Sequence, residues 1–166
     1  MPKLKRTLLV TLLALAAMPV ATSSAGVVLD PEEQAFCTQI NQYRAANGVA
    51  PLRVSVSLAN AADWMSNDMA TKNYFAHTDS LGRTFSTRLK AFGYTFNTAR
   101  GENLAAGNAT AAGAFAQWKA SAGHNTNMLS SSYKVIGIAR AYSATARYKW
   151  YWTTDFGGYV DQSVAC

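Results

Sequence analysis

The chain has 166 residues, and its 15 Lys and Arg outnumber nine Asp and Glu, which gives a formal net charge of +6 at neutral pH. This length is enough for one domain with a substantial core. From Arg44 to Lys149 the basic residues stand singly and form no run. A nucleic-acid partner would need a clustered basic stripe, so the sequence argues against that class of function.

The first 25 residues predict a cleaved export signal. A basic start (Lys3–Arg6) precedes an apolar stretch from Leu8 to Val20, and the small residues of Ser23–Ala25 follow. The stretch is too short to cross a bilayer comfortably; a membrane anchor or a core helix is the alternative. We expect residues 26–166 to form a single domain, secreted or periplasmic, with no membrane span after cleavage.

Two cysteines, Cys37 and Cys166, stand near the two ends of this exported domain. In an oxidising compartment such a pair is typical of one disulfide bond. Two free thiols, or a bond from Cys166 to a second chain, are the alternatives. An intramolecular bond would close nearly the whole domain and fasten its C-terminus to the first helix.

Four helices are predicted before residue 120. Asp30 is suited to cap the first helix, and Gly48 ends it. The second begins at about Ser57, the third covers residues 84–92 and the fourth lies near residues 110–119. Apolar residues recur in each at helical spacing.

The last third of the chain changes from helical to strand periodicity. Segments 134–142 and 147–156 are rich in β-branched and aromatic residues, and a turn separates them. The alternation of Tyr148, Trp150 and Trp152 predicts that one aromatic face is buried. Helices followed by strands indicate an α+β layered domain.

The candidate chemistry rests on three polar residues that we expect in loops. His77 and His124 are the only histidines of the chain, and Glu102 lies between two glycine-flanked turns. A purely structural role is the alternative for each of them. Their spacing matches no local metal-ligand motif, and the chain has neither a nucleotide-binding glycine motif nor a G-x-S-x-G nucleophile elbow.

The order of six segments along the chain is more specific than any of these residues alone. The segments are INQYRAANGVAPL, LANAADWMSNDMA, YFAHTDSLGRTFSTRLKAFGY, GENLAAG, QWKASAGHNTNML and IGIARAY with YWTTDFG. Together they resemble the CAP superfamily, which groups cysteine-rich secretory proteins, insect venom antigens, plant pathogenesis-related proteins and many secreted bacterial proteins. The resemblance covers residues 30–158. It implies a three-layer α-β-α sandwich with a surface cleft.

The resemblance also implies which residues line that cleft. His77 matches the histidine after YF, Glu102 the glutamate of GEN, and His124 the last residue of a W-x-x-S-x-G-H motif. Animal and plant members carry a second glutamate where this chain has Ser121, so a triad replaces their tetrad. The implied cofactor is a divalent cation such as zinc, weakly bound by His77 and His124.

These observations favour a secreted, monomeric and non-catalytic binding module. Its cleft would hold a divalent cation or a small polar or lipid ligand, and its extracellular partner would be cell-wall, lipid or protein material. The alternative is a metal-dependent hydrolase acting on peptide or cell-wall material, because two imidazoles and a carboxylate would leave zinc an open coordination position. A purely structural surface protein is a third possibility.

Overall fold

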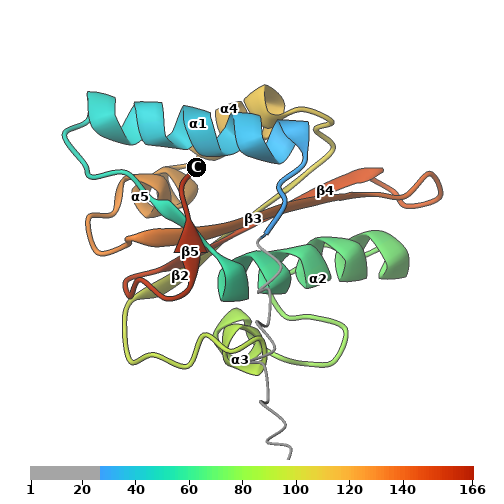
Figure 1. Cartoon of the computed structure of the whole chain (residues 1–166). Helices are drawn as coiled ribbons and strands as arrows, with labels where there is room; N and C mark the ends of the chain where they lie inside the picture. Colours follow the sequence, from blue (N-terminus) through green and yellow to red (C-terminus); the bar gives the residue numbers. More distant parts are fainter. Residues whose placement is uncertain (1–26) are drawn as a thin grey trace, which may run out of the picture.

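The computed structural model describes residues 27–166, so the predicted signal segment lies outside the described residues. A central sheet lies between two layers of helices (Figure 1). One layer comprises α1 (Pro31–Ala46), α4 (Ala111–Ala120) and α5 (Ala122–Leu129), and the other comprises α2 (Val56–Lys72) and α3 (Phe85–Ala91). The predicted α-β-α sandwich of the α+β class is confirmed.

The sheet has five strands in the order β2-β4-β3-β1-β5. They are β1 (Arg53–Ser55), β2 (Arg100–Ala106), β3 (Val135–Tyr142), β4 (Trp150–Gly157) and β5 (Ser163–Val164). Strands β2, β4 and β3 form an antiparallel unit, β1 runs parallel to β3, and β5 is antiparallel to β1. Strand β2 therefore forms one edge of the sheet, and it carries Glu102.

Two predicted loops are regular elements in the structure. The glycine-flanked segment around Glu102 is strand β2, which pairs with β4 along its whole length. The segment around His124 is helix α5, which packs against α4 and β2. Both segments have compositions with weak intrinsic preferences, so their conformation depends on packing with distant parts of the chain.

Helix α1 is tied at its start to the sheet. The Asp30 carboxylate accepts hydrogen bonds from the backbone N–H groups of Glu32 and Glu33, and the Glu33 carboxylate accepts one from the N–H of Asp30, which completes a capping box. Glu33 also accepts a hydrogen bond from the backbone N–H of Arg140 in β3, at 2.9 Å. The cap thus fixes both the first turn of α1 and its place on the sheet.

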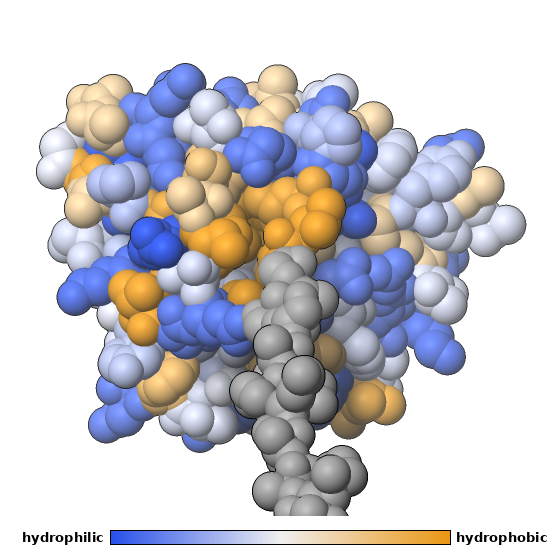
Figure 2. Space-filling model, in the orientation of Figure 1, coloured by the Kyte–Doolittle hydropathy of each residue, from blue (hydrophilic) through white to orange (hydrophobic). Residues whose placement is uncertain are grey.

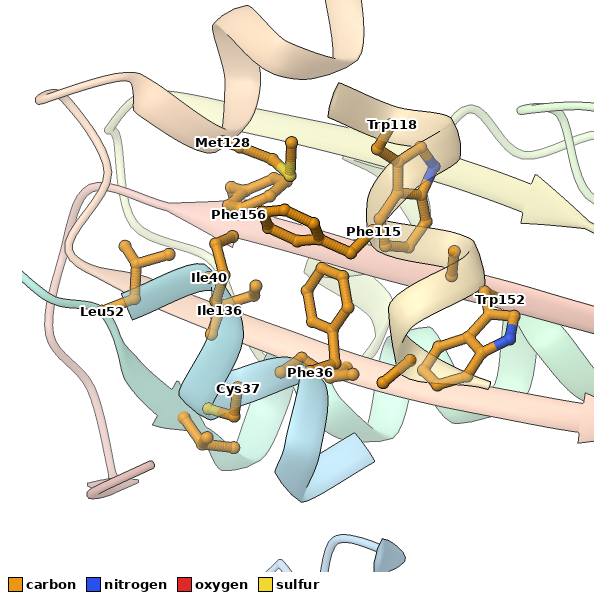
Figure 3. Packing of buried hydrophobic residues seen from close by; sticks show 14 of the residues in the cluster. Phe36, Cys37, Ile40, Leu52, Phe115, Trp118, Met128, Ile136, Trp152 and Phe156 are labelled. Carbon is orange, nitrogen blue, oxygen red and sulfur yellow. The ribbon is translucent and has the colours of Figure 1, made fainter. Parts of the chain in front are cut away.

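The larger core fills the space between the sheet and the α1 layer (Figure 3). Phe36 of α1 meets Trp118 of α4 edge-on, with 5.1 Å between the ring centroids, and Trp152 of β4 lies 6.1 Å from Phe36. The indole N–H of Trp118 donates to the backbone carbonyl of Leu104, at 2.8 Å. This bond satisfies the one polar atom of a fully buried side chain.

A disulfide joins Cys37, buried in α1, to Cys166 at the end of the chain, with 5.5 Å between the Cα atoms. The intramolecular disulfide bond expected from the sequence is therefore present. The bond holds the C-terminal residues beside α1, just after the short strand β5.

The prediction that Tyr148 is buried on the same aromatic face as Trp150 and Trp152 is wrong. Trp152 packs in the core on the α1 side, whereas the Tyr148 ring contacts Tyr151, which belongs to the cluster on the α2 side. The cause is Lys149, whose φ of 64° breaks the extended backbone just before β4 begins. Tyr148 therefore stays partly exposed on the opposite face of the hairpin.

Candidate functional site

His77 and Glu102 are in direct contact. Glu102 projects from β2 with a side chain that is 1% exposed, while the His77 ring, in the loop between α2 and α3, is 56% exposed. Nδ1 of His77 lies 2.7 Å from Oε1 of Glu102. Because a carboxylate only accepts hydrogen bonds, Nδ1 carries the proton, and Nε2 is the acceptor nitrogen of the neutral ring.

Arg88 of α3 holds the other oxygen of Glu102. Its fully buried guanidinium donates to Oε2 of Glu102 and to the backbone carbonyl of His77, and it lies 3.7 Å from the Asp79 carboxylate. Arg88 therefore fixes both the carboxylate and the loop that carries His77. Arg88 is not among the residues predicted from the sequence, although an arginine between Phe85 and Leu89 in an apolar stripe is a signal of a buried cation.

Asp155 is a second residue that the sequence analysis missed. It is the cross-strand partner of Glu102 on β4 and is fully buried, and in the part of the chain that the structure describes neither of its carboxylate oxygens has a hydrogen-bond partner of ordinary geometry. Burial, and then the negative charge of Glu102, raise the pKa of Asp155 well above its ordinary value. Asp155 therefore keeps its proton to a higher pH than an exposed aspartate does.

His124 lies nearby on α5. Its backbone carbonyl accepts a hydrogen bond from the Asn103 side chain, at 3.0 Å, and Asn103 is the strand neighbour of Glu102. The Nδ1 atom of His124 is buried and has no partner within residues 27–166. The structure thus places His124 beside the His77–Glu102 pair, without a direct hydrogen bond to either residue in the described part of the chain.

The two imidazoles have opposite electrostatic surroundings. The hydrogen bond to Glu102 raises the pKa of His77 above its ordinary value, although burial opposes the change. Burial lowers the pKa of His124, and the charge of His77 lowers it further. His77 is therefore the first of the two to take up a proton as the pH falls.

The donor set fits a divalent cation only in part. In the structure, one oxygen of Glu102 is held by His77 and the other by Arg88, so this carboxylate orients His77. Within residues 27–166, no group of three or more His, Cys, Asp or Glu is arranged to hold a metal ion. The candidate ligands are therefore the imidazoles of His77 and His124. The His77 ring is oriented by the Glu102 carboxylate, an arrangement found in many protein zinc sites.

A separate cavity of about 400 Å³ lies on another side of the molecule, between the start of the described chain, α2 and β3. Val27, Val28 and Leu29 form part of its lining, and hydrophobic surface gathers beside this start of the chain (Figure 2). His77, Glu102 and His124 are not among the residues that line this cavity. No helix among the described residues is long and apolar enough to cross a membrane.

Comparison with families and curated proteins gives consistent matches. The family model described as the cysteine-rich secretory protein family (CAP) matches residues 38–156. The uncharacterized protein YkwD of Bacillus subtilis (strain 168) is 33% identical over 138 residues, which cover 82% of this chain and 51% of YkwD. The uncharacterized membrane protein YlbC of the same organism is 32% identical over 98 residues, 59% of this chain and 28% of YlbC. The chain thus spans about half the length of YkwD and less of YlbC.

Solved structures show the same fold. An extracellular protein of Bacillus anthracis that contains an SCP domain superposes with a TM-score of 0.67 at 25% identity, covering 80% of this chain and 45% of that protein. An outer surface protein of Borrelia burgdorferi superposes with a TM-score of 0.69 at 20% identity, covering 80% of this chain and 97% of that one.

Proposed function

Because the chain belongs to the cysteine-rich secretory protein family, we propose that it is an exported, non-catalytic binding module in which His77 and His124 hold a divalent cation. Two similar structures are those of an extracellular protein and an outer surface protein, which supports export. The signal-like segment 1–25 supports it independently. The observation that carries the proposal is the linked set of Arg88, Glu102 and His77.

This set prepares His77 to bind a cation. Arg88 holds Glu102, and Glu102 accepts the Nδ1 proton of His77, so Nε2 is the nitrogen with a lone pair for a metal ion. A carboxylate in this position also makes the imidazole a stronger ligand. His124 supplies a second imidazole, and its lowered pKa keeps the ring neutral at physiological pH, as metal binding requires.

The same contacts argue against the hydrolase alternative. A zinc hydrolase holds its metal with three protein ligands, and a further group handles the proton of the attacking water. Glu102 is the carboxylate in contact with His77, and both of its oxygens are paired. A cation bound by two imidazoles would keep several open positions, which suits capture of an oxygen-rich ligand from solution.

Calorimetric titration of the exported protein with zinc at pH 7.5 tests this proposal. We expect affinity in the micromolar range, and loss of binding in both His77→Ala and His124→Ala with melting temperatures in chelator unchanged. Thr78→Ala, an exposed neighbour of His77, serves as the matched control and should bind as the parent does. If either histidine variant binds zinc as tightly as the parent, the two rings do not form one site.

A further inference from the structure

We infer that the end of the β3–β4 hairpin and the loop after α2 form a second binding surface, which takes an acidic polysaccharide. This surface, the aromatic–basic tip, consists of Asn73, Phe75, Arg147, Tyr148 and Lys149. All five residues are exposed. It uses none of the residues of the histidine site, so the inference goes beyond the proposed function and does not depend on it.

The tip presents two aromatic rings that packing holds in place. Phe75 and Tyr148 lie 6.0 Å apart between ring centroids at an interplanar angle of 64°, and they are 42% and 37% exposed. Buried Tyr151 supports Tyr148 from the core side, also at 6.0 Å. The Arg147 guanidinium lies 5.2 Å from the centroid of the Tyr148 ring. A ring face and a cation are therefore available at the same place.

The backbone of the tip is constrained at two points. Asn73, with φ of 55°, and Lys149, with φ of 64°, are the two non-glycine residues of the described chain that have positive φ. The side-chain oxygen of Asn73 accepts a hydrogen bond from the backbone N–H of Arg147, at 2.7 Å, which joins the two segments. Left-handed backbone at a lysine is uncommon and tends to occur at binding sites, where the surrounding structure maintains it. In this hairpin, the left-handed backbone at Lys149 accompanies the placement of the Tyr148 ring beside Phe75.

The tip carries two positive charges, on Arg147 and Lys149, while the Asp68 carboxylate of α2 beside the loop is hydrogen-bonded to Tyr74 and Ser80. Segments 71–78 and 143–150, which meet here, contain no Asp or Glu. Among the described residues, neither Arg147 nor Lys149 forms a salt bridge. The surface therefore suits a ligand that combines an apolar ring face with a negative charge.

A sugar ring that bears its own carboxylate has this combination. Its C–H face can pack on Phe75 and Tyr148, while its carboxylate pairs with Arg147, whose planar guanidinium binds carboxylates through two parallel hydrogen bonds. In a phosphodiester-linked polymer the charges lie between the units instead. The Arg147 guanidinium covers one face of the Tyr148 ring, so a sugar that packs on the exposed parts of Tyr148 and Phe75 would bring its own carboxylate beside this guanidinium, and the geometry favours a uronic acid polymer.

The test uses a galacturonic acid oligosaccharide as the probe and the exported protein in chelator, which silences the histidine site. We expect saturable binding that weakens as salt is added. Tyr148→Ala and Arg147→Gln should each weaken it at least about tenfold. Tyr142→Ala removes a ring of similar exposure from the other face of the same hairpin, so it should bind as the parent does.

Two further probes separate charge from ring packing. A neutral oligosaccharide of the same length should bind much more weakly, and so should poly-glutamate, which has the charge without sugar rings. Equal binding of poly-glutamate, an equal loss in Tyr142→Ala, or no binding of the galacturonic acid probe by the parent would each overturn the inference. Zinc binding would be unaffected by any of these results, so the two proposals fail separately.

Discussion

Glu102 of β2 and Asp155 of β4 are directly paired on neighbouring strands, and both carboxyl groups are buried. Among residues 27–166, however, only Glu102 forms ion pairs, with His77 and Arg88. Glu102 lies between Arg88 and His77, whereas within residues 27–166 neither oxygen of Asp155 forms a hydrogen bond of ordinary geometry. The pKa of Asp155 is raised by burial and then by the charge of Glu102. Arg88 thus holds Glu102 directly, whereas the raised pKa means that Asp155 keeps its proton to a higher pH than an exposed aspartate does.

The first prediction follows from the position of Arg88. Arg88→Met should destabilise the fold by about 3–5 kcal/mol, because it leaves Glu102 buried without its cation. Urea unfolding at pH 7 measures the change. Lys90→Met, an exposed change on the same helix, is the control and should shift stability by no more than about 0.5 kcal/mol. Equal unfolding midpoints for the two variants would contradict the buried ion pair.

The second prediction concerns the proton on His77. Glu102→Gln should lower the pKa of His77, because the hydrogen bond to the Glu102 carboxylate is what raises it. Titration of the imidazole resonances by NMR measures this. Since the folded pKa lies above the unfolded value, the pair stabilises the fold fully below about pH 6.5, and the contribution is lost as the pH rises through the folded pKa. An unchanged His77 pKa in the variant would rule out the contact.

The third prediction concerns addition and removal of the metal. Zinc at about 100 times its dissociation constant should stabilise the fold by about 2.7 kcal/mol, and chelator should reverse this effect. Affinity should fall steeply between about pH 7 and pH 5, because protons compete for the imidazoles. The raised pKa of His77 means that the loss begins at a higher pH than for an unperturbed histidine. Thermal melts at pH 7.5 and 5.5, with and without zinc, would show both effects, and a zinc shift of equal size at the two pH values would exclude histidine ligands.

How far the sequence predicts this fold depends on where each element obtains its stability. Helix α1 was predictable because Asp30, Pro31 and Glu33 encode its start locally, and the structure has that cap. Strand β2 and helix α5 were not predictable, because their residues have weak preferences and form regular structure only against β4 and α4.

The same distinction applies to the candidate site. His77, Glu102 and His124 were found by motif order, whereas the ion pair between Arg88 and Glu102 joins separate segments and leaves no local pattern. Asp155 was missed for the same reason, since its neighbour Glu102 is set by the register of β2 against β4.

The fourth prediction concerns the disulfide. Cys166→Ser should lower stability by about 2–5 kcal/mol, because the bond closes a loop spanning most of the domain and so restricts the unfolded chain. The residues after β4 should become the first to open, since β5 pairs with β1 over only two residues. Hydrogen exchange of residues 158–165 measures this local opening. Unchanged exchange there, together with an unchanged melting temperature, would mean that the bond does not hold the C-terminus.

The fifth prediction compares two tryptophans. Trp118 is fully buried and meets Phe36 edge-on (Figure 3), and its N–H donates to the backbone carbonyl of Leu104, so Trp118→Ala should cost about 3–5 kcal/mol. Trp64 is partly exposed, and the Arg83 guanidinium lies 4.4 Å from the centroid of its ring, so Trp64→Ala should cost about 1–2 kcal/mol.

Equilibrium urea unfolding of both variants gives the comparison, and Lys119→Ala is the control. Lys119 is exposed and its amine lies 5.0 Å from the centroid of the Tyr43 ring, so its loss should cost less than about 1 kcal/mol. We expect the largest loss of unfolding free energy for Trp118→Ala, a smaller loss for Trp64→Ala and the smallest for Lys119→Ala. This order follows from burial, because the cost of removing a side chain rises with the apolar contacts that it leaves unfilled. An equal cost for the two tryptophans would contradict this order, because it would mean that loss of the Trp64 ring leaves as many apolar contacts unfilled as loss of the Trp118 ring does.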